Sequence, residues 1–281
     1  MNKYRIGIIG NGFVGQAIAN AFALTNPMKI YDKDPKRGIN TLFETVENSD
    51  VIFICVPTPM NTKLGNKIDL SIINSIFENI HGLKIDLKQK VFVVKSTVIP
   101  GTVNALISES QGARLVFNPE FLTERSANLD FINATRIVLG GPSADVQVVE
   151  EMYRERFPYK RIIKTDTETS EFVKYVCNCF FATKVTFMNE MYEMAVALGL
   201  DWEKVMEGFV TDGRVGNSHL DVPGHDGSLG FGGKCFPKDI NAMINFYEEK
   251  GITPTVLKAV WKKNTEIRQN KDWESIEGAT S

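Results

Sequence analysis

The sequence predicts an α/β protein in which a doubly wound, mostly parallel sheet precedes a smaller, all-helical domain. Three observations support this. Short apolar runs alternate with helical patterns in the first half, a glycine-rich turn follows the first run, and one long helical pattern dominates the second half. A chain of 281 residues is also long enough for two domains. We expect these domains over residues 1–166 and 167–272, with a loose tail over residues 273–281.

The composition excludes several classes of protein. Hydrophobic residues make up 43% and charged residues 23% of the chain, and the net charge of −2 provides no basic field for nucleic acid. No apolar run approaches the roughly 20 residues that span a bilayer. The four cysteines lack zinc or disulfide spacing, and His219, Asp221, His225 and Asp226 match no metal-binding pattern. We therefore expect a soluble, cytoplasmic protein with no metal, nucleic-acid or membrane partner.

The first strand and helix are joined by a phosphate-binding motif. The apolar run Ile6–Ile9 leads into Gly10-Asn11-Gly12-Phe13-Val14-Gly15, and a helical pattern follows. In G-x-G-x-x-G, Gly10 allows the tight turn, Gly12 lets the backbone approach a pyrophosphate, and Gly15 lets the helix pack on the strand. The helix N-terminus then offers N–H donors to the phosphates. The context of strand, turn and helix predicts a Rossmann-type dinucleotide site.

An acidic residue after the second strand favours NAD as the dinucleotide. The strand pattern Lys29–Tyr31 ends at Asp32, about 20 residues after the glycines, where an acid binds the adenosine ribose. Asp32 would also repel a 2′-phosphate, which favours NAD over NADP, although Lys33, Lys36 and Arg37 weaken this preference. A flavin or S-adenosylmethionine site on the same motif is the alternative.

Later strands end in polar turns that should meet at one edge of the sheet. Helical patterns over Leu70–Ile80 and Thr102–Ser110 separate some of these strands, as in a doubly wound sheet. Prolines after strands are usually loop punctuation. Because ligands bind beyond the carboxyl ends of such strands, we favour a functional role for Thr97 and Glu120. The strands are Val51–Val56, Val91–Lys95, Leu115–Phe117 and Ile137–Gly140, and the turns are Val56-Pro57-Thr58-Pro59, Ser96-Thr97 and Asn118-Pro119-Glu120.

The second half begins with a predicted helix from Ser170 to about Leu198. Lys174 and Asn178 share one of its faces. A lysine there commonly extends to solvent and an asparagine commonly packs or caps, but as a pair facing a cleft they would stabilise an oxyanion. Beyond this helix we expect an N-cap at Asp201, a long loop over Thr211–Cys235, and a helix from Pro254 to about Trp273.

The segment Gly230–Asp239 places one thiol between two lysines. Neighbouring cations favour the thiolate of Cys235, which is its nucleophilic form. Gly232 and Gly233 would let a ligand approach the backbone, and Asp239 could position a water or accept a proton. A structural cysteine in a glycine turn is the ordinary alternative.

Taken together, these motifs resemble the UDP-glucose dehydrogenase family, which includes GDP-mannose and UDP-N-acetyl-hexosamine dehydrogenases. Several separate motifs in the same order are far more specific than one glycine loop. The resemblance extends from the first strand to the helix after Pro254, through Lys95–Thr102, Asn118–Glu124, Glu171–Lys174, Asn178–Glu190 and Gly230–Asp239.

The resemblance implies an NAD-dependent, four-electron oxidation of a nucleotide sugar, UDP-glucose to UDP-glucuronate, through a thiohemiacetal and a thioester on Cys235. It assigns oxyanion stabilisation to Lys174 and Asn178, the catalytic water to Asp239 and Thr97, and thioester hydrolysis to Glu120. The expected cofactor contacts are Gly10, Gly12, Phe13, Val14, Gly15, Asp32, Lys33, Pro57, Thr58, Thr97 and Glu124. The expected substrate contacts are Glu120, Phe121, Leu122, Lys174, Asn178, Arg214, Gly232 and Lys238.

The sequence departs from the family pattern at its end. Typical members continue into a further domain that binds much of the nucleotide, whereas this sequence ends at Ser281. We expect a natural short form and a homodimer formed through the central helix, since the amphipathic helix after Pro254 resembles the one that family members use to dimerise. Two other hypotheses remain: a binding module that holds NAD without turnover, and a two-electron dehydrogenase of the hydroxyacid type with a structural Cys235.

Overall fold

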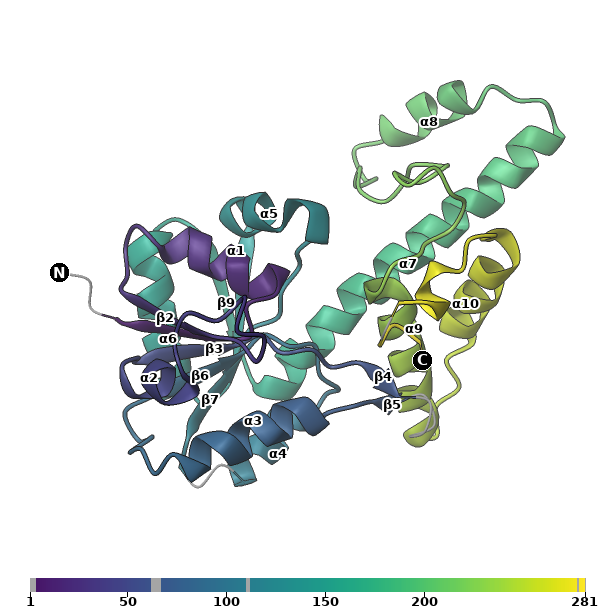
Figure 1. Cartoon of the computed structure of the whole chain (residues 1–281). Coiled ribbons are helices and arrows are strands. Elements are labelled where there is room, and N and C mark those ends of the chain that lie inside the picture. The colour runs from purple at the N-terminus through teal and green to yellow at the C-terminus, as the bar shows by residue number, and fades with distance from the viewer. Residues whose placement is uncertain (1–3, 62–66, 110–111, 277, 281) are drawn as a thin grey trace. The chain divides into compact units, whose positions relative to one another are not determined.

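The computed structural model describes residues 4–61, 67–109, 112–276 and 278–280 (Figure 1). The chain forms two compact units. Unit 1 comprises Met1–Thr58 and Asp69–Lys174, and unit 2 comprises Pro59–Ile68 and Tyr175–Ser281. The division falls within helix α7 (Thr167–Ala197), whose first turns belong to unit 1 and whose remainder belongs to unit 2.

Unit 1 is built on a seven-stranded sheet with the order β2-β1-β3-β6-β7-β8-β9. The first five strands in this order are parallel to one another, so their carboxyl ends meet at one edge. The doubly wound, mostly parallel sheet is thus confirmed, except that β8 pairs antiparallel with β7. The strands are β1 (Ile6–Ile9), β2 (Met28–Tyr31), β3 (Val51–Ile54), β6 (Val91–Val94), β7 (Arg114–Phe117), β8 (Arg136–Gly140) and β9 (Arg161–Thr165).

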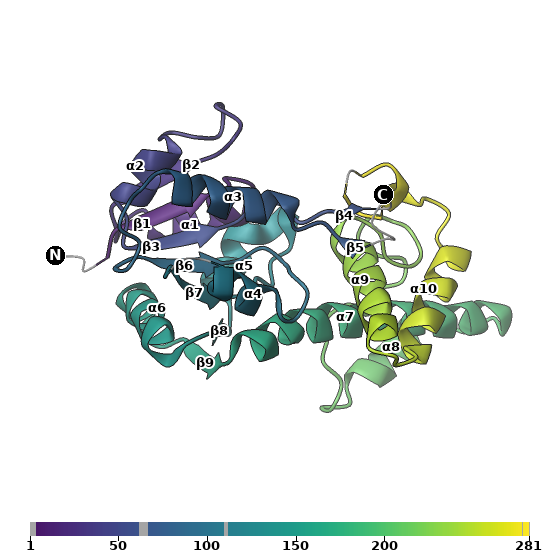
Figure 2. The same cartoon turned by 90° about the horizontal axis from the view of Figure 1, so that it is seen from below.

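Helices cover both faces of this sheet because its central strands are apolar on both sides. In β3, Val51 and Phe53 enter one core, whereas Ile52 and Ile54 enter the other. The first core contains α1 (Phe13–Phe22), α5 (Ala127–Asn133) and α6 (Ser143–Arg156). The second contains α2 (Leu42–Glu47), α3 (Ser71–Gly82) and α4 (Thr102–Glu109). Figure 2 shows α3 and α6 on opposite faces of the sheet.

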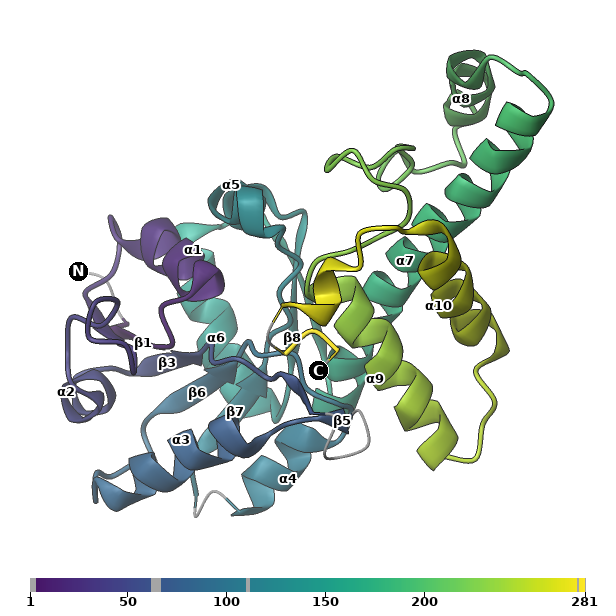
Figure 3. The ribbon, with the colours of Figure 1, turned by 45° about the vertical axis from the view of Figure 1, so that its right-hand side comes forward.

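The regular elements described in unit 2 are helices, apart from two short antiparallel strands, β4 (Met60–Asn61) and β5 (Lys67–Ile68). The predicted long helix is confirmed as α7, and the predicted cap is confirmed because Asp201 Oδ1 accepts hydrogen bonds from two backbone N–H groups of α8 (Trp202–Val210). The other helices are α9 (Cys235–Glu249) and α10 (Thr255–Ile267), which lie side by side (Figure 3).

Two predictions about the C-terminal part are wrong. Helix α10 ends at Ile267, because Arg268 has an extended backbone and its side chain turns back into unit 2. The described part of the tail is packed: Trp273 is 2% exposed, its ring lies 5.3 Å from that of Trp261, and Met60 N–H donates to the Gly278 carbonyl. Ser110, at the end of one predicted helix, and residues 277 and 281 of the tail lie outside the described residues.

Within the described ranges, no helix is both long and apolar enough to cross a membrane.

Candidate functional site

The glycine-rich turn of unit 1 has the geometry that a dinucleotide requires. Gly10 has a φ of 94°, and a Cβ there would lie 2.6 Å from the Cys55 carbonyl oxygen. A Cβ on Gly15 would collide with the Gly10 carbonyl oxygen, whereas one on Gly12 would meet no atom within 4 Å. Gly10 and Gly15 are therefore required by the fold, and Gly12 leaves space open at the start of α1.

Helix α1 begins at this turn without a side-chain cap, so its first N–H groups are open to a ligand. The side chains of Phe13 and Val14 pack against the core of unit 1. Contacts from these two residues to a cofactor would therefore come from their backbone.

Asp32 lies just after β2 and is oriented by two backbone groups. Its Oδ2 accepts a hydrogen bond from Asn11 N–H at 2.6 Å, and its Oδ1 accepts one from Asp34 N–H at 2.8 Å. The neighbouring Asn11 side chain donates to the Arg37 carbonyl, and its Oδ1 is buried without a partner among the described residues. A buried acceptor beside the glycine turn fits a ligand that brings donors, as a dinucleotide ribose does. Lys33 is exposed.

Hydrogen bonds connect the turns that follow β3 and β6. Thr58 Oγ1 donates to the Thr97 carbonyl at 2.6 Å, and Ser96 Oγ donates to the Val56 carbonyl at 2.6 Å. Thr58 is buried, Thr97 is half-buried and Pro57 is exposed. The structure thus brings these predicted residues together at the carboxyl edge of the sheet.

The turn after β7 holds a buried ion pair between Glu120 and Lys174. Lys174 Nζ donates to Glu120 Oε1 and to the Glu120 carbonyl, both at 2.7 Å, and Glu120 Oε2 accepts from Leu122 N–H. The lysine is 3% exposed, so it does not extend to solvent. The ring of Phe121 lies under Arg136 and near Lys174. Glu124 is exposed, at the start of the 3₁₀ turn Glu124–Ser126.

Sequence reasoning missed Lys95, which supports this turn. Its Nζ donates to Asn118 Oδ1 at 3.1 Å and to the Pro119 carbonyl at 3.4 Å, and Tyr153 Oη also donates to Asn118 Oδ1. Burial lowers the pKa of Lys95 to about 8, and burial likewise raises the pKa of Cys55 to about 12. A charged residue at the end of an apolar strand was the available signal.

In unit 2, Cys235 is the exposed first residue of α9, and Asp239 lies one turn further along the helix. Asp239 is 1% exposed; its Oδ1 accepts from Lys238 Nζ at 2.6 Å, and its Oδ2 accepts from Asn178 Nδ2 at 2.5 Å. Residues four apart share a helix face. A solvent-accessible thiol thus lies one turn from a buried carboxylate that orients an amide.

Although they are four residues apart on α7, Lys174 and Asn178 have different partners. Lys174 binds Glu120 in unit 1, and Asn178 binds Asp239 in unit 2. Of the other expected substrate residues, Lys238 is buried against Asp239, and Arg214 binds Asp212 with a side chain that is 90% exposed.

The two glycines before the thiol differ from each other. A Cβ on Gly233 would meet no atom within 4 Å, as expected for a backbone open to a ligand. A Cβ on Gly232 would instead collide with Arg268 and Asp272, so packing accounts for the missing side chain at that position.

A cavity of about 1080 Å³ lies along α6 and the end of β9 in unit 1, and none of the predicted site residues lines it. Its lining mixes acidic and basic side chains, among them Glu150, Arg154 and Lys164.

Two models of one family match the chain. The NAD binding domain of the UDP-glucose/GDP-mannose dehydrogenase family matches residues 26–157, and the central domain matches residues 168–266. The first match begins at residue 26, after the glycine turn. The indication that this turn faces a dinucleotide therefore comes from its own geometry. Because the family's NAD binding domain is present, the cofactor is NAD.

The chain is also similar to individual members. It is 31% identical to the UDP-glucose 6-dehydrogenase TuaD of Bacillus subtilis, over 94% of this chain and 63% of the relative. It is 34% identical to the UDP-glucose 6-dehydrogenase of Rickettsia conorii, over 85% of this chain and 54% of the relative. The chain thus spans less than two thirds of either relative.

Among solved structures, the UDP-glucose dehydrogenase of Pyrobaculum islandicum superposes with a TM-score of 0.81 and 29% identity, over 94% of this chain and 68% of that one. The order of motifs, the fold and these matches agree: the chain belongs to the UDP-glucose/GDP-mannose dehydrogenase family.

Proposed function

We propose that this protein oxidises the primary alcohol of a nucleotide sugar to a carboxylate with NAD, and that the sugar is UDP-glucose. The arrangement at the start of α9 supports this most directly: Cys235 is exposed, and one turn away the buried Asp239 orients the amide of Asn178. The relatives named as UDP-glucose 6-dehydrogenases support the choice of sugar.

The residues of unit 1 fit the cofactor. The free N–H groups at the start of α1 would hold the pyrophosphate, with room provided by Gly12. The Asp32 carboxylate, already oriented by Asn11 and Asp34, has lone pairs left for the ribose hydroxyls. Bound NAD supplies the hydride acceptor for each of the two oxidations.

The thiol divides the reaction into stages. The alcohol carbon loses a hydride and its hydroxyl a proton, which gives an aldehyde. Cys235 Sγ then adds to the aldehyde carbon to form a thiohemiacetal, which retains the intermediate on the protein. Loss of a second hydride and a proton leaves a thioester. Water cleaves the C–S bond of the thioester, and this step releases the acid and restores the thiol.

We assign the remaining roles to polar residues of the two units. Because one N–H of Asn178 is bound to Asp239, the orientation of the amide is set and its second N–H is available for an oxyanion. Lys174 is assigned to stabilising the same oxyanion. Its ion-pair partner Glu120 is assigned to activating the water that hydrolyses the thioester. Asp239 and Thr97 are assigned to positioning that water.

The direct test measures NADH formed per UDP-glucose consumed, by absorbance at saturating NAD. We expect two NADH per sugar. A ratio of one would exclude the thioester route and favour the two-electron dehydrogenase. If UDP-glucose gives no NADH, GDP-mannose and N-acetylated nucleotide sugars are tested next. NAD binding without turnover of any of these sugars would favour the binding module.

We also infer that the protein forms a homodimer through α7. In unit 2 this helix presents exposed apolar side chains along one stripe, with Phe180 59%, Phe187 53% and Met194 58% exposed. Their spacing of three, four or seven residues places them on one face of the helix. The stripe comprises Val176, Phe180, Phe187, Met191 and Met194.

Sedimentation of Phe187→Glu tests the dimer. We expect the wild-type protein to sediment as a dimer and the variant as a monomer, because a charge on the stripe opposes its burial. Leu24→Glu, which changes a 93% exposed leucine in unit 1, is the matched control and should leave the dimer intact. A monomeric wild type would contradict the inference.

A further inference from the structure

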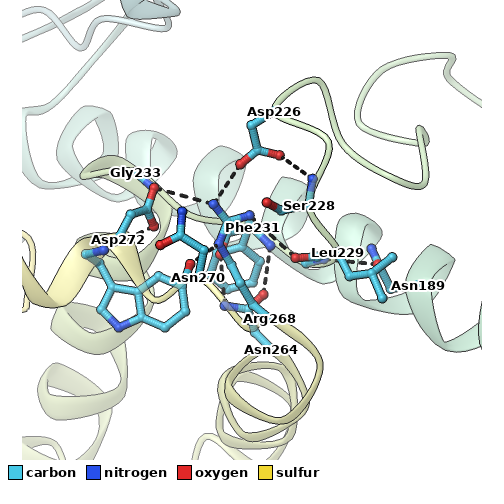
Figure 4. Close-up of polar contacts among 12 residues, drawn as sticks. Asn189, Asp226, Ser228, Leu229, Phe231, Gly233, Asn264, Arg268, Asn270 and Asp272 are labelled. Atoms are coloured by element: carbon cyan, nitrogen blue, oxygen red, sulfur yellow. Dashed lines mark hydrogen bonds and ion pairs between the residues drawn. The ribbon is translucent and has the colours of Figure 1, made fainter.

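The segment that leads to Cys235 is held by side chains rather than by regular structure. Gly230 N–H donates to Asn189 Oδ1 at 3.0 Å, and Gly233 N–H donates to Asp272 Oδ2 at 3.0 Å. Asn264 binds the backbone of Phe231 twice, accepting from its N–H at 2.7 Å and donating to its carbonyl at 3.0 Å. Side chains from α7, from α10 and from the turn Asp272–Glu274 thus set the path of this loop (Figure 4).

Arg268 lies at the centre of these contacts, with a side chain that is 1% exposed (Figure 4). Its Nη2 donates to Asp226 Oδ2 at 2.7 Å and to Asp272 Oδ2 at 3.4 Å, the same oxygen that accepts from Gly233. Nη1 donates to the Leu229 carbonyl and Nε to the Asn270 carbonyl. We refer to Asp226, Arg268 and Asp272 as the Arg268 cluster.

Both the charge and the shape of Arg268 suit it to hold the loop that precedes Cys235. Burial opposes ionisation of Asp226, yet hydrogen bonds from Arg268 and from Ser228 N–H hold the pKa of its carboxyl below the usual range. The guanidinium also occupies the space that a side chain on Gly232 would need. A lysine has no planar fork and cannot bind both carboxylates and the carbonyls in the same way.

The contacts of Arg268 argue against a role in binding substrate. Its guanidinium is almost fully buried and faces two carboxylates, so an anionic ligand would have to displace an existing partner. What these contacts determine is the path of residues 229–233, which immediately precede the thiol.

We infer that Arg268 is a positioning residue for Cys235: through Asp226, Asp272 and the Leu229 carbonyl it holds the loop that places the thiol at the N-terminus of α9. This inference rests on the proposed role of Cys235 as the nucleophile. A helix N-terminus stabilises a thiolate, so the position of the thiol there determines its reactivity. A displacement of about 1 Å can cost on the order of a hundredfold in rate.

The test uses the full chain and two readouts, of which the first is independent of turnover. The rate at which iodoacetamide alkylates Cys235 at pH 7 is measured by mass spectrometry of its peptide, and kcat and KM are measured with NAD and UDP-glucose. For Arg268→Lys we expect alkylation to slow about tenfold and kcat to fall about 10- to 100-fold, with little change in KM for NAD. Asp226→Asn, at the exposed edge of the cluster, should show the same changes at a smaller size and is the variant to use if Arg268→Lys does not fold.

Matched controls come from another arginine–aspartate ion pair, in unit 1, where Arg114 Nε donates to Asp145 Oδ1 at 2.6 Å. Arg114→Lys and Asp145→Asn should lower thermal stability without changing the alkylation of Cys235. Folded Arg268→Lys or Asp226→Asn with wild-type alkylation would overturn the inference, as would equal slowing in the unit 1 controls. If the wild type alkylates as expected but oxidises no nucleotide sugar, the proposed function fails while the positioning role stands.

Discussion

The candidate NAD-binding residues of unit 1 and the cysteine loop of unit 2 are held in place in different ways. In unit 1, Gly10 and Asp32 directly follow parallel strands and Thr97 lies soon after another, so the hydrogen bonds of the sheet place them. In unit 2, residues 226–234 belong to no helix or strand, and the Arg268 cluster with Asn189 and Asn264 places them.

This difference predicts how each part responds to substitution. A sheet edge distributes its support over many backbone bonds, whereas the cysteine loop depends on a few buried side chains whose partners are costly to leave unpaired. Single substitutions should therefore separate cofactor binding from thiol chemistry.

The largest expected effect is that of Cys235→Ser. A serine hydroxyl is far less nucleophilic than a thiolate, so the second oxidation should fall to background. NAD affinity, measured by fluorescence titration, should not change, because the proposed cofactor residues lie in unit 1. Full formation of two NADH per sugar by the variant would show that Cys235 is structural.

Next in size are two substitutions in the glycine turn. Gly15→Ala places a methyl group against the Gly10 carbonyl, so we expect a loss of about 1–3 kcal/mol in unfolding free energy as well as loss of NAD binding. Gly12→Ala meets open space at a φ of −72°, so the melting temperature should hold while NAD affinity falls at least about tenfold.

Calorimetry and NAD titration of both glycine variants check this expectation. Equal losses of stability in Gly12→Ala and Gly15→Ala would contradict the distinction between a glycine needed by the fold and one needed by the ligand.

The smallest expected effect is that of Lys95→Met. It tests the one turn of unit 1, Asn118–Glu120, for which we describe support from a buried lysine rather than from the sheet alone. Burial lowers the pKa of Lys95 to about 8, so its charge costs about 3 kcal/mol at neutral pH. Lys95→Met removes that cost and loses hydrogen bonds worth about 1 kcal/mol each, so we expect a higher melting temperature at pH 7.

The pH dependence of the Lys95 effect has a definite sign. Folded wild type releases the proton near pH 8, whereas the unfolded chain keeps it to about pH 10.5, so the wild type gains stability as pH rises between these values. The advantage of Lys95→Met should shrink over the same window. An advantage that is constant with pH, or a less stable variant at pH 7, would contradict this account.

Much of the fold followed from local pattern. The runs at Ile6–Ile9 and Val91–Val94 are apolar throughout because both of their faces are buried, and the absence of glycine and proline from Ser170 to Leu198 indicated α7. The antiparallel pairing of β8 and the end of α10 at Ile267 had no such local signal: β8 pairs with β7 at Gly140 and Phe117, and Arg268, just after α10, binds Asp226 far away in the chain.

The candidate site divides in the same way. The glycine turn, Asp32 and the segment Gly230–Asp239 were recognisable because their chemistry requires particular residues at short spacing. Lys95 and the Arg268 cluster were not, because their partners lie far away in the chain; Asp226 and Arg268 are 42 residues apart.

The sequence by itself determined the alternation of strands and helices, the dinucleotide motif and the placement of Cys235 between two lysines, because periodicity, glycine geometry and local charge act over a few neighbouring residues. Only the tertiary structure decided that Lys174 binds Glu120, that Asn178 binds Asp239 and that Arg268 supports the cysteine loop. Partners of buried charges are chosen by packing, and the chain must fold before those charges meet.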